Sequence, residues 1–280
     1  YGGQYFAVFL TKLSHTKVEL TYNLMRTFVA GLAFAMPFSL VYQMMSDRMK
    51  GQQRSEKVIK RLPFAAGFTA GTAVSIAGNM HYVIYAQIIP LIEKLTGKEV
   101  SSYWFPDATR YIGYNPYREE DRTIHEFPCY SFVLGDLHAH VVNIMFVLLV
   151  IALLYVWLRG VRKKTVPVET SMKDGKFWKE QLLMPHLLVI SVLLGMFQWT
   201  NFWDFVIYYV VTLGTVLFAN IIRFQGKIKK IIVVTFAQMA EIYLLAYLVI
   251  LPFTLQFDTM VDGIGIAKYH SYFYQLLDLW

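Results

Sequence analysis

The chain has 280 residues, of which 56% are hydrophobic and 16% are charged, and its mean hydropathy is +0.42. This composition is too apolar for a soluble domain of that length and indicates an integral membrane protein. The formal charge of +7 could suggest a nucleic-acid-binding protein, but the Lys and Arg residues lie in short loops between apolar runs rather than on one solvated face, so we expect no nucleic-acid partner.

Six apolar stretches reach the length of about 20 residues that a helix needs to cross the hydrocarbon core. After an amphipathic segment of about twenty residues, we predict membrane-spanning helices at 24–45, 63–84, 141–158, 182–200, 205–222 and 231–257. The last is the longest, so it should tilt, protrude or break at Pro252, which lacks a backbone donor. The predicted fold class is an all-α polytopic helical membrane protein, with residues 1–280 forming a single transmembrane domain, a fragment of a larger protein.

The cations predict the orientation of these helices, because loops on the cytoplasmic side are enriched in Lys and Arg. They gather at 48–61, 159–179 and 223–230. The opposite ends, which include the long segment of about 85–140 and the short turn at 199–204, are therefore predicted to be non-cytoplasmic. We expect a protein of the cell (plasma) membrane whose functional face is the non-cytoplasmic one.

The predicted external loop of about 85–140 ends in the densest cluster of chemically active side chains. Asp136, His138 and His140 directly precede the third predicted span. They would share one face of an extended segment, and in a helix Asp136 and His140 would share a face at i, i+4. Such a set could bind a divalent metal such as Mg or Mn, hold a phosphate group or act as general acid and base. The alternative is that these residues cap the next helix.

A second cluster lies in the turn between the fourth and fifth predicted spans. Asn201 and Asp204 lie there, level with the acidic loop, and a carboxylate at that depth needs a partner. Trp203 in the same turn also fits the aromatic belt of a membrane protein. Glu241 falls inside the last span and is predicted either to pair with Arg26 or another polar group of the bundle, or to be functional.

Arg110 and Glu126 are further candidates in the predicted external loop. The Arg110 guanidinium could bind a phosphate or carboxylate, or it could form a surface ion pair with Asp107. Glu126 belongs to the same cluster as Asp136. The single cysteine of the chain, Cys129, excludes an intramolecular disulfide framework and a cysteine-rich metal cluster.

Taken together, these motifs resemble the YYY membrane proteins, a family of polytopic proteins named for a tyrosine run in an external loop. The motifs that carry the resemblance are Tyr1-Gly-Gly-Gln-Tyr5, Tyr22-Asn23-Leu24, Glu126-Phe127-Pro128, Ser131-Phe132, the Asp-Leu-His-x-His run at 136–140, Asn201 with Trp203 and Asp204, and Leu251-Pro252-Phe253. The resemblance covers nearly the whole chain and implies that Tyr1 is the last residue of the tyrosine run. Ala139 departs from the family, which commonly has proline between the two histidines, so a rigid turn is not implied here.

The YYY proteins are in turn similar to the C-type (GT-C) membrane glycosyltransferases, which implies transfer of a sugar from a polyprenyl-phosphate donor on the non-cytoplasmic side. The resemblance then implies membrane lipid and that donor as partners. We predict Asp136, Glu126 and Asp204 as catalytic residues and Arg110, Asn201, Trp203 and Tyr1 as substrate-binding residues. His138 and His140, with Asp136, are predicted to handle a metal or the phosphate.

Two other functions stay open at this point. A transporter or flippase of a lipid-linked or anionic solute would place paired charges and broken helices near the bilayer midplane. A non-catalytic scaffold would bind a partner through its loops and tolerate replacement of Asp136 and His138.

Overall fold

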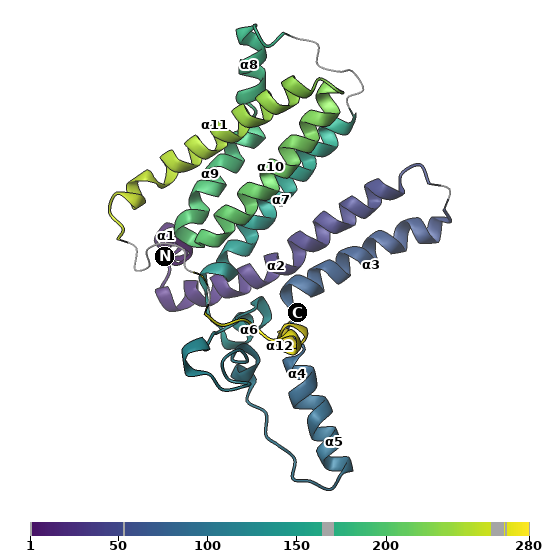
Figure 1. The fold of residues 1–280 in the computed structure, drawn as a ribbon, viewed down its shortest axis with the longest axis vertical. Helices are drawn as coiled ribbons and strands as arrows, with labels where there is room; N and C mark the ends of the chain where they lie inside the picture. Colours follow the sequence, from purple (N-terminus) through teal and green to yellow (C-terminus); the bar gives the residue numbers. More distant parts are fainter. Residues whose placement is uncertain (1, 53, 164–170, 259–265, 267, 280) are drawn as a thin grey trace. The chain divides into compact units, whose positions relative to one another are not determined.

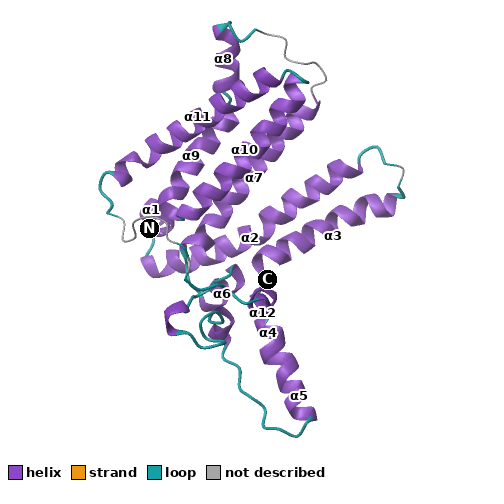
Figure 2. Cartoon of the chain, in the orientation of Figure 1, coloured by secondary structure: helices purple, strands orange, loops and turns teal. Residues whose placement is uncertain are grey.

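The computed structural model describes residues 2–52, 54–163, 171–258, 266 and 268–279. These residues are helical wherever they form regular secondary structure, apart from an isolated bridge between Tyr114 and Tyr117 (Figures 1 and 2). The chain divides into two compact units. Unit 1 combines Tyr1–Met36 with Leu137–Thr259, and unit 2 combines Pro37–Asp136 with Met260–Trp280.

Unit 1 is built around a bundle of four helices, α7 (Ala139–Lys163), α9 (Pro185–Thr200), α10 (Phe202–Phe224) and α11 (Ile228–Thr254), which pack side by side (Figure 1). Their shared core is aliphatic and aromatic, with Leu194, Phe197 and Ile242 fully buried. Gly195 lets α9 approach α11 closely, because a Cβ at this position would lie 2.6 Å from the carbonyl oxygen of Ala246. The backbones of α9 and α11 are therefore in close contact at this point.

Helices α1 (Gly2–Ser14) and α8 (Gly175–Leu182) and the first part of α2 (Val18–Met49), up to Met36, complete unit 1. Helix α1 packs against α7 and α9, and α2 follows it after a short turn. Helix α8 begins at Asp174, whose side chain accepts a hydrogen bond from the backbone N–H of Lys176 at 2.9 Å. Between α8 and α9 the axis bends by 50°, just before Pro185, which cannot donate the backbone bond that would continue the helix.

In the part of the chain that the structure describes, four helices, α2, α7, α10 and α11, are long and apolar enough to cross a membrane, and the bent pair α8–α9 brings the number to five if it forms one span. The predicted all-α polytopic fold is therefore confirmed, with four or five candidate spans in these residues where about six were predicted. The predicted span at 63–84 is not one helix: α3 (Glu56–Ser75) ends at Ser75 and a helix resumes only at His81. Its first turns carry Lys57, Lys60 and Arg61, which shorten the apolar part.

In unit 2 the end of α2 packs against α3, where a Cβ on Gly67 would lie 2.7 Å from the Phe38 carbonyl oxygen. A continuous helical stretch follows, made of α4 (His81–Val83), the π-helix η1 (Ile84–Ile88) and α5 (Ile89–Leu95). The rest of the predicted loop holds the short helices η2 (Phe105–Thr109), η3 (Glu119–Asp121) and α6 (Pro128–Leu134). Helix α12 (Phe273–Leu279) is tied to this region by a hydrogen bond from the Met80 N–H to the Asp278 carbonyl at 2.8 Å.

Candidate functional site

The Asp204 carboxylate, in the first turn of α10, is held by two amide side chains of unit 1. Asn143 Nδ2 on α7 donates to Asp204 Oδ2 at 2.6 Å, and Asn201 Nδ2 donates to the same oxygen at 2.9 Å. Amide N–H groups and a helix N-terminus both stabilise negative charge. Among the residues that the structure describes, Oδ1 of Asp204 accepts no hydrogen bond, so one oxygen is fixed and the other can act on a ligand.

Asn143 is oriented by a third polar residue. Its side chain is fully buried, and its Oδ1 accepts a hydrogen bond from Thr200 Oγ1 at 3.0 Å. Thr200 is the last residue of α9 and is itself buried. An amide whose oxygen is engaged in this way must turn its NH2 group to the opposite side, which here holds Asp204. The three helices α7, α9 and α10 thus each contribute to one polar cluster, which we call the Asp204 cluster: Asn143, Thr200, Asn201 and Asp204.

His140 lies one turn before Asn143 on α7. Its imidazole interacts electrostatically with the Asp204 carboxylate and with His138, and its ring is nearly parallel to that of His138 at a centroid distance of 5.9 Å. His140 Nε2 is buried and has no hydrogen-bond partner within the described part of the chain. A carboxylate and an imidazole, each with an unused position, therefore lie together at one end of the bundle.

Helix α1 packs directly against the Asp204 cluster through residues without a side chain. A Cβ on Gly2 would lie 2.7 Å from Thr200 Cγ2, and one on Gly3 would lie 3.0 Å from Val142 Cβ. The next residue, Gln4, donates through Nε2 to the Leu137 carbonyl at 3.0 Å. The two glycines thus allow α1 to seat against the site at backbone distance.

The predicted triad of Asp136, His138 and His140 is divided by the fold. Asp136 is exposed and belongs to unit 2, where its N–H closes the end of α6 on the Ser131 carbonyl at 2.9 Å, whereas both histidines belong to unit 1. Helix α7 begins at Ala139, so the single helix that would place Asp136 and His140 on one face is not formed. Instead, the backbone carbonyl oxygen of His138 accepts hydrogen bonds from the N–H groups of Val141 and Val142 at the start of α7.

The described residues do not gather three or more His, Cys, Asp or Glu side chains in positions that could hold a metal ion. The fold places His140 within electrostatic range of Asp204, which lies 64 positions later in the sequence. The sequence motifs did not predict this pair.

The other predicted site residues are not members of the Asp204 cluster. The Arg110 guanidinium lies over the Trp104 ring at 5.0 Å, and Glu126 is half-buried in unit 2. Trp203 is 69% exposed and makes an edge contact with Phe202, as expected for an aromatic belt. Tyr1 lies outside the described residues.

The predicted pairing of Glu241 with Arg26 is wrong. Arg26 donates to Asn23 Oδ1 at 3.1 Å, and Glu241 Oε2 on α11 is buried with no hydrogen-bond partner among the residues described. One Arg26 nitrogen is therefore used within its own helix, since residues three apart on a helix are neighbours, while Arg26 Nε is buried without a hydrogen-bond partner in the described part of the chain.

Sequence reasoning missed Asn143 and Thr200. Asn143 is a single polar residue at the start of an apolar run, whereas Thr200 lies in the polar turn between two spans, where Asn201, Trp203 and Asp204 were predicted as site residues. A signal was available for Asn143, because a lone amide inside a membrane-spanning segment must find a partner in the bundle. The identity of that partner required the structure.

A second polar cluster occupies the opposite end of α10 and is also buried. Asn220 Nδ2 donates to Gln238 Oε1 at 2.8 Å and to Thr235 Oγ1 at 3.0 Å, and its Oδ1 accepts from Arg223 at 3.0 Å. Gln238 Nε2 in turn donates to the Gln181 carbonyl at 2.9 Å, and Arg223 bonds the Gln181 side chain. We call this set the Asn220 cluster: Gln181, Asn220, Arg223, Thr235 and Gln238.

Comparison with known proteins places the chain at the level of a family. No curated protein and no solved structure shows a significant match. One family model, described as "Uncharacterized membrane protein (DUF2298)", matches residues 1–280. The chain therefore belongs to this family of integral membrane proteins.

Proposed function

We propose that this chain is the membrane-embedded part of a glycosyltransferase that takes a sugar from a polyprenyl-phosphate carrier on the non-cytoplasmic face of the plasma membrane. The observation that carries the proposal is the fixed Asp204 carboxylate beside His140, with one acceptor oxygen and one ring nitrogen unused in the part of the chain described. A positioned carboxylate of this kind is suited to accept a proton from a hydroxyl group.

The reaction would proceed by direct displacement at the anomeric carbon. Asp204 Oδ1 takes the proton of the acceptor hydroxyl as its oxygen forms a bond to the sugar. The bond between the sugar and the phosphate oxygen breaks, its electron pair leaves with the phosphate, and the anomeric configuration is inverted. His140 Nε2, when protonated, donates a hydrogen bond to the departing phosphate, where charge accumulates.

The remaining predicted residues have supporting roles in this proposal. Asn201 positions the base through its 2.9 Å bond to Asp204. His138 lies parallel to His140 and adds a second imidazole for the phosphate. Asp136, Glu126, Arg110 and Trp203 are proposed to contact the acceptor or the carrier when the substrates are bound.

The test is a transfer assay on membranes that contain the protein, with radiolabelled polyprenyl-phosphate sugars and cell-envelope acceptors. We expect label to leave the lipid carrier with the wild type and to remain on it with Asp204→Asn at matched protein levels. Glu56→Gln is the control, because this carboxylate is exposed and pairs with Lys60 at the end of the chain's basic loop. Absence of transfer by folded wild-type protein across a broad donor panel would refute the proposal.

A transporter is the second candidate, and it rests on Glu241. A buried carboxyl oxygen without a partner among the described residues, in the middle of an apolar helix, is typical of ion-coupled transport. In that case Glu241→Gln should abolish uptake into proteoliposomes while Asp204→Asn retains it. The opposite pattern supports the transferase.

A further inference from the structure

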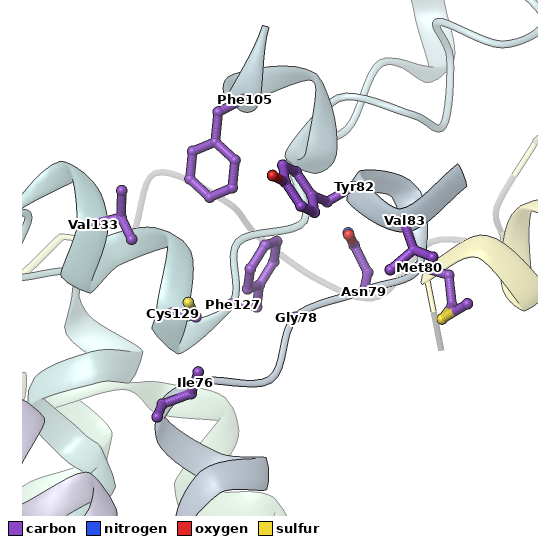
Figure 3. A pocket seen from close by; sticks show the side chains of 10 residues that line it. All are labelled: Ile76, Gly78, Asn79, Met80, Tyr82, Val83, Phe105, Phe127, Cys129 and Val133. Carbon is purple, nitrogen blue, oxygen red and sulfur yellow. The ribbon is translucent and has the colours of Figure 1, made fainter. Parts of the chain in front are cut away.

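A pocket of about 410 Å³ opens on unit 2, between the end of α3 and helices α4, η2 and α6 (Figure 3). Its volume falls within the range of small-molecule sites in proteins. The lining is dominated by aromatic and aliphatic side chains, which in Figure 3 include Phe105, Phe127 and Tyr82. Phe127 packs on the backbone of Gly78, where a Cβ would lie 2.8 Å from its ring.

Two polar groups in this wall have unused hydrogen-bonding capacity. Asn79 donates through Nδ2 to the Ala108 carbonyl at 2.6 Å, but its Oδ1 is buried and accepts no bond from any described residue. The Tyr82 hydroxyl accepts a bond from Gln87 Nε2 at 3.2 Å and keeps its own O–H available for a ligand. A mostly apolar pocket with one unpaired acceptor fits an apolar ligand that carries a single donor at one end.

The surface around the pocket is also apolar. Ile76 and Val133 at its rim are 61% and 63% exposed, and Phe64 and Phe68 on the preceding helix α3 are exposed as well. An exposed apolar surface of this kind on a membrane protein is better suited to contact with lipid than with water. The partial negative charge of Asn79 Oδ1 complements the hydroxyl hydrogen of a lipid head group, whereas a sugar would leave most of its hydroxyl groups unpaired here.

We propose that this pocket binds one hydrocarbon chain of a membrane lipid, with a head-group hydroxyl donating to Asn79 Oδ1. The chain can be the isoprenoid of a carrier lipid or an acyl chain of a bilayer phospholipid. The inference does not rest on the proposed transferase activity, because binding is measured directly and no turnover is required.

Cys129 provides the readout, because it lines the pocket and is the single cysteine of the chain. The purified protein in detergent is reacted with a maleimide at mildly alkaline pH, since burial raises the pKa of the Cys129 thiol. The rate is compared without lipid and with undecaprenol or dioleoyl phosphatidylglycerol, each of which carries a hydroxyl group. At a lipid concentration of roughly ten times Kd, occupancy should slow alkylation about tenfold.

Two variants control for effects outside the pocket. Ser102→Cys in a Cys129→Ser background places the thiol on an exposed residue that does not line the pocket, and its alkylation rate should not respond to lipid. Val133→Trp narrows the pocket at an exposed position of α6, where a larger side chain is tolerated by the fold, and it should abolish the protection of Cys129.

The role of Asn79 is tested with a matched pair of probes, a long-chain alcohol and its methyl ether. The alcohol should protect Cys129 at about fivefold lower concentration, because only the alcohol can satisfy the buried acceptor. Equal protection by both probes would refute the contact with Asn79.

The outcomes separate the two lipid sources. Protection by undecaprenol alone identifies an isoprenoid site, and protection by both lipids identifies a general chain site. Either result supports lipid binding, even if the transfer assay fails. Unchanged alkylation at saturating lipid, or equal slowing of the Ser102→Cys reporter, would overturn the proposal.

Discussion

The two polar clusters of unit 1 lie at opposite ends of the same helix, α10, and differ in how completely they are satisfied. In the Asn220 cluster, the Asn220 side chain uses both its NH2 group and its oxygen, and Gln238 also bonds through both ends of its amide. In the Asp204 cluster, one carboxylate oxygen and the neighbouring His140 Nε2 have no hydrogen-bond partner in the described residues.

This difference separates a structural role from a chemical one. A buried polar network whose members all find partners rigidifies a bundle and leaves nothing for a ligand. A network that holds a carboxylate through one oxygen while the other remains available resembles a preorganised catalytic group. The comparison therefore predicts that substitutions at one end change stability and substitutions at the other change activity.

The largest expected effect is the loss of transfer in Asp204→Asn. The amide keeps the shape of the carboxylate but cannot accept a proton, so we expect the rate to fall by about 10²–10⁴. The melting temperature in detergent, followed by tryptophan fluorescence, should change little. A large drop in melting temperature with an unchanged rate per folded molecule would show that the Asp204 cluster has a structural role, like the Asn220 cluster.

Asp278 in unit 2 is a buried carboxylate outside both clusters. It tests how a buried polar group without a hydrogen-bond partner affects stability. Neither of its oxygens has a partner among the described residues, and burial raises its pKa from 3.8 to about 6. The folded state thus holds this proton more tightly than the unfolded state. The resulting stabilisation is complete below about pH 4 and is lost as the pH rises through about 6, at a cost of about 3 kcal/mol.

The measurement is urea unfolding of the wild type and Asp278→Asn between about pH 4 and 8. The variant should be the more stable protein at pH 8, and the difference should disappear toward pH 4. A pH-independent difference would show that the carboxylate finds a partner that the structure does not contain.

Gln238→Met should affect stability without affecting transfer. Methionine has a similar volume but removes the hydrogen bonds to Asn220 and the Gln181 carbonyl, so the free energy of unfolding should fall by about 2 kcal/mol. The rate of transfer per folded molecule should stay at the wild-type level. A specific loss of activity would remove the distinction between the two ends of the bundle.

The smallest effect is expected for Thr200→Val, which deletes the hydroxyl that orients Asn143. Thr200 acts on the base through Asn143, so we expect a rate reduced about tenfold, with kcat affected more than KM. Thr212→Val is the matched control, because the buried Thr212 hydroxyl bonds the Tyr208 carbonyl of its own helix at 2.7 Å. Equal rates for the two variants would count against a positioning role for Thr200.

The sequence was sufficient to predict the membrane class and the helices with the highest hydropathy, because burial in lipid requires long uninterrupted apolar runs. The span predicted at 63–84 failed because hydropathy does not report the break after Ser75. Asp204 and Asn201 were predicted from one short turn. Their partner Asn143 could not be, since pairing between α7 and α10 depends on the packing of the bundle rather than on spacing along the chain.

Helix α1 contacts the Asp204 cluster on one side and exposes apolar side chains on the other. The same short helix that touches Thr200 through Gly2 exposes Tyr5, Val8, Phe9 and Leu13, whose side chains are 48–66% exposed and suited to the surface of a bilayer. Because Gly2 has no side chain, the backbone of α1 lies against the Thr200 side chain, whose hydroxyl orients Asn143. A displacement of α1 at the membrane surface is therefore expected to shift Thr200 and, through Asn143, the Asp204 carboxylate.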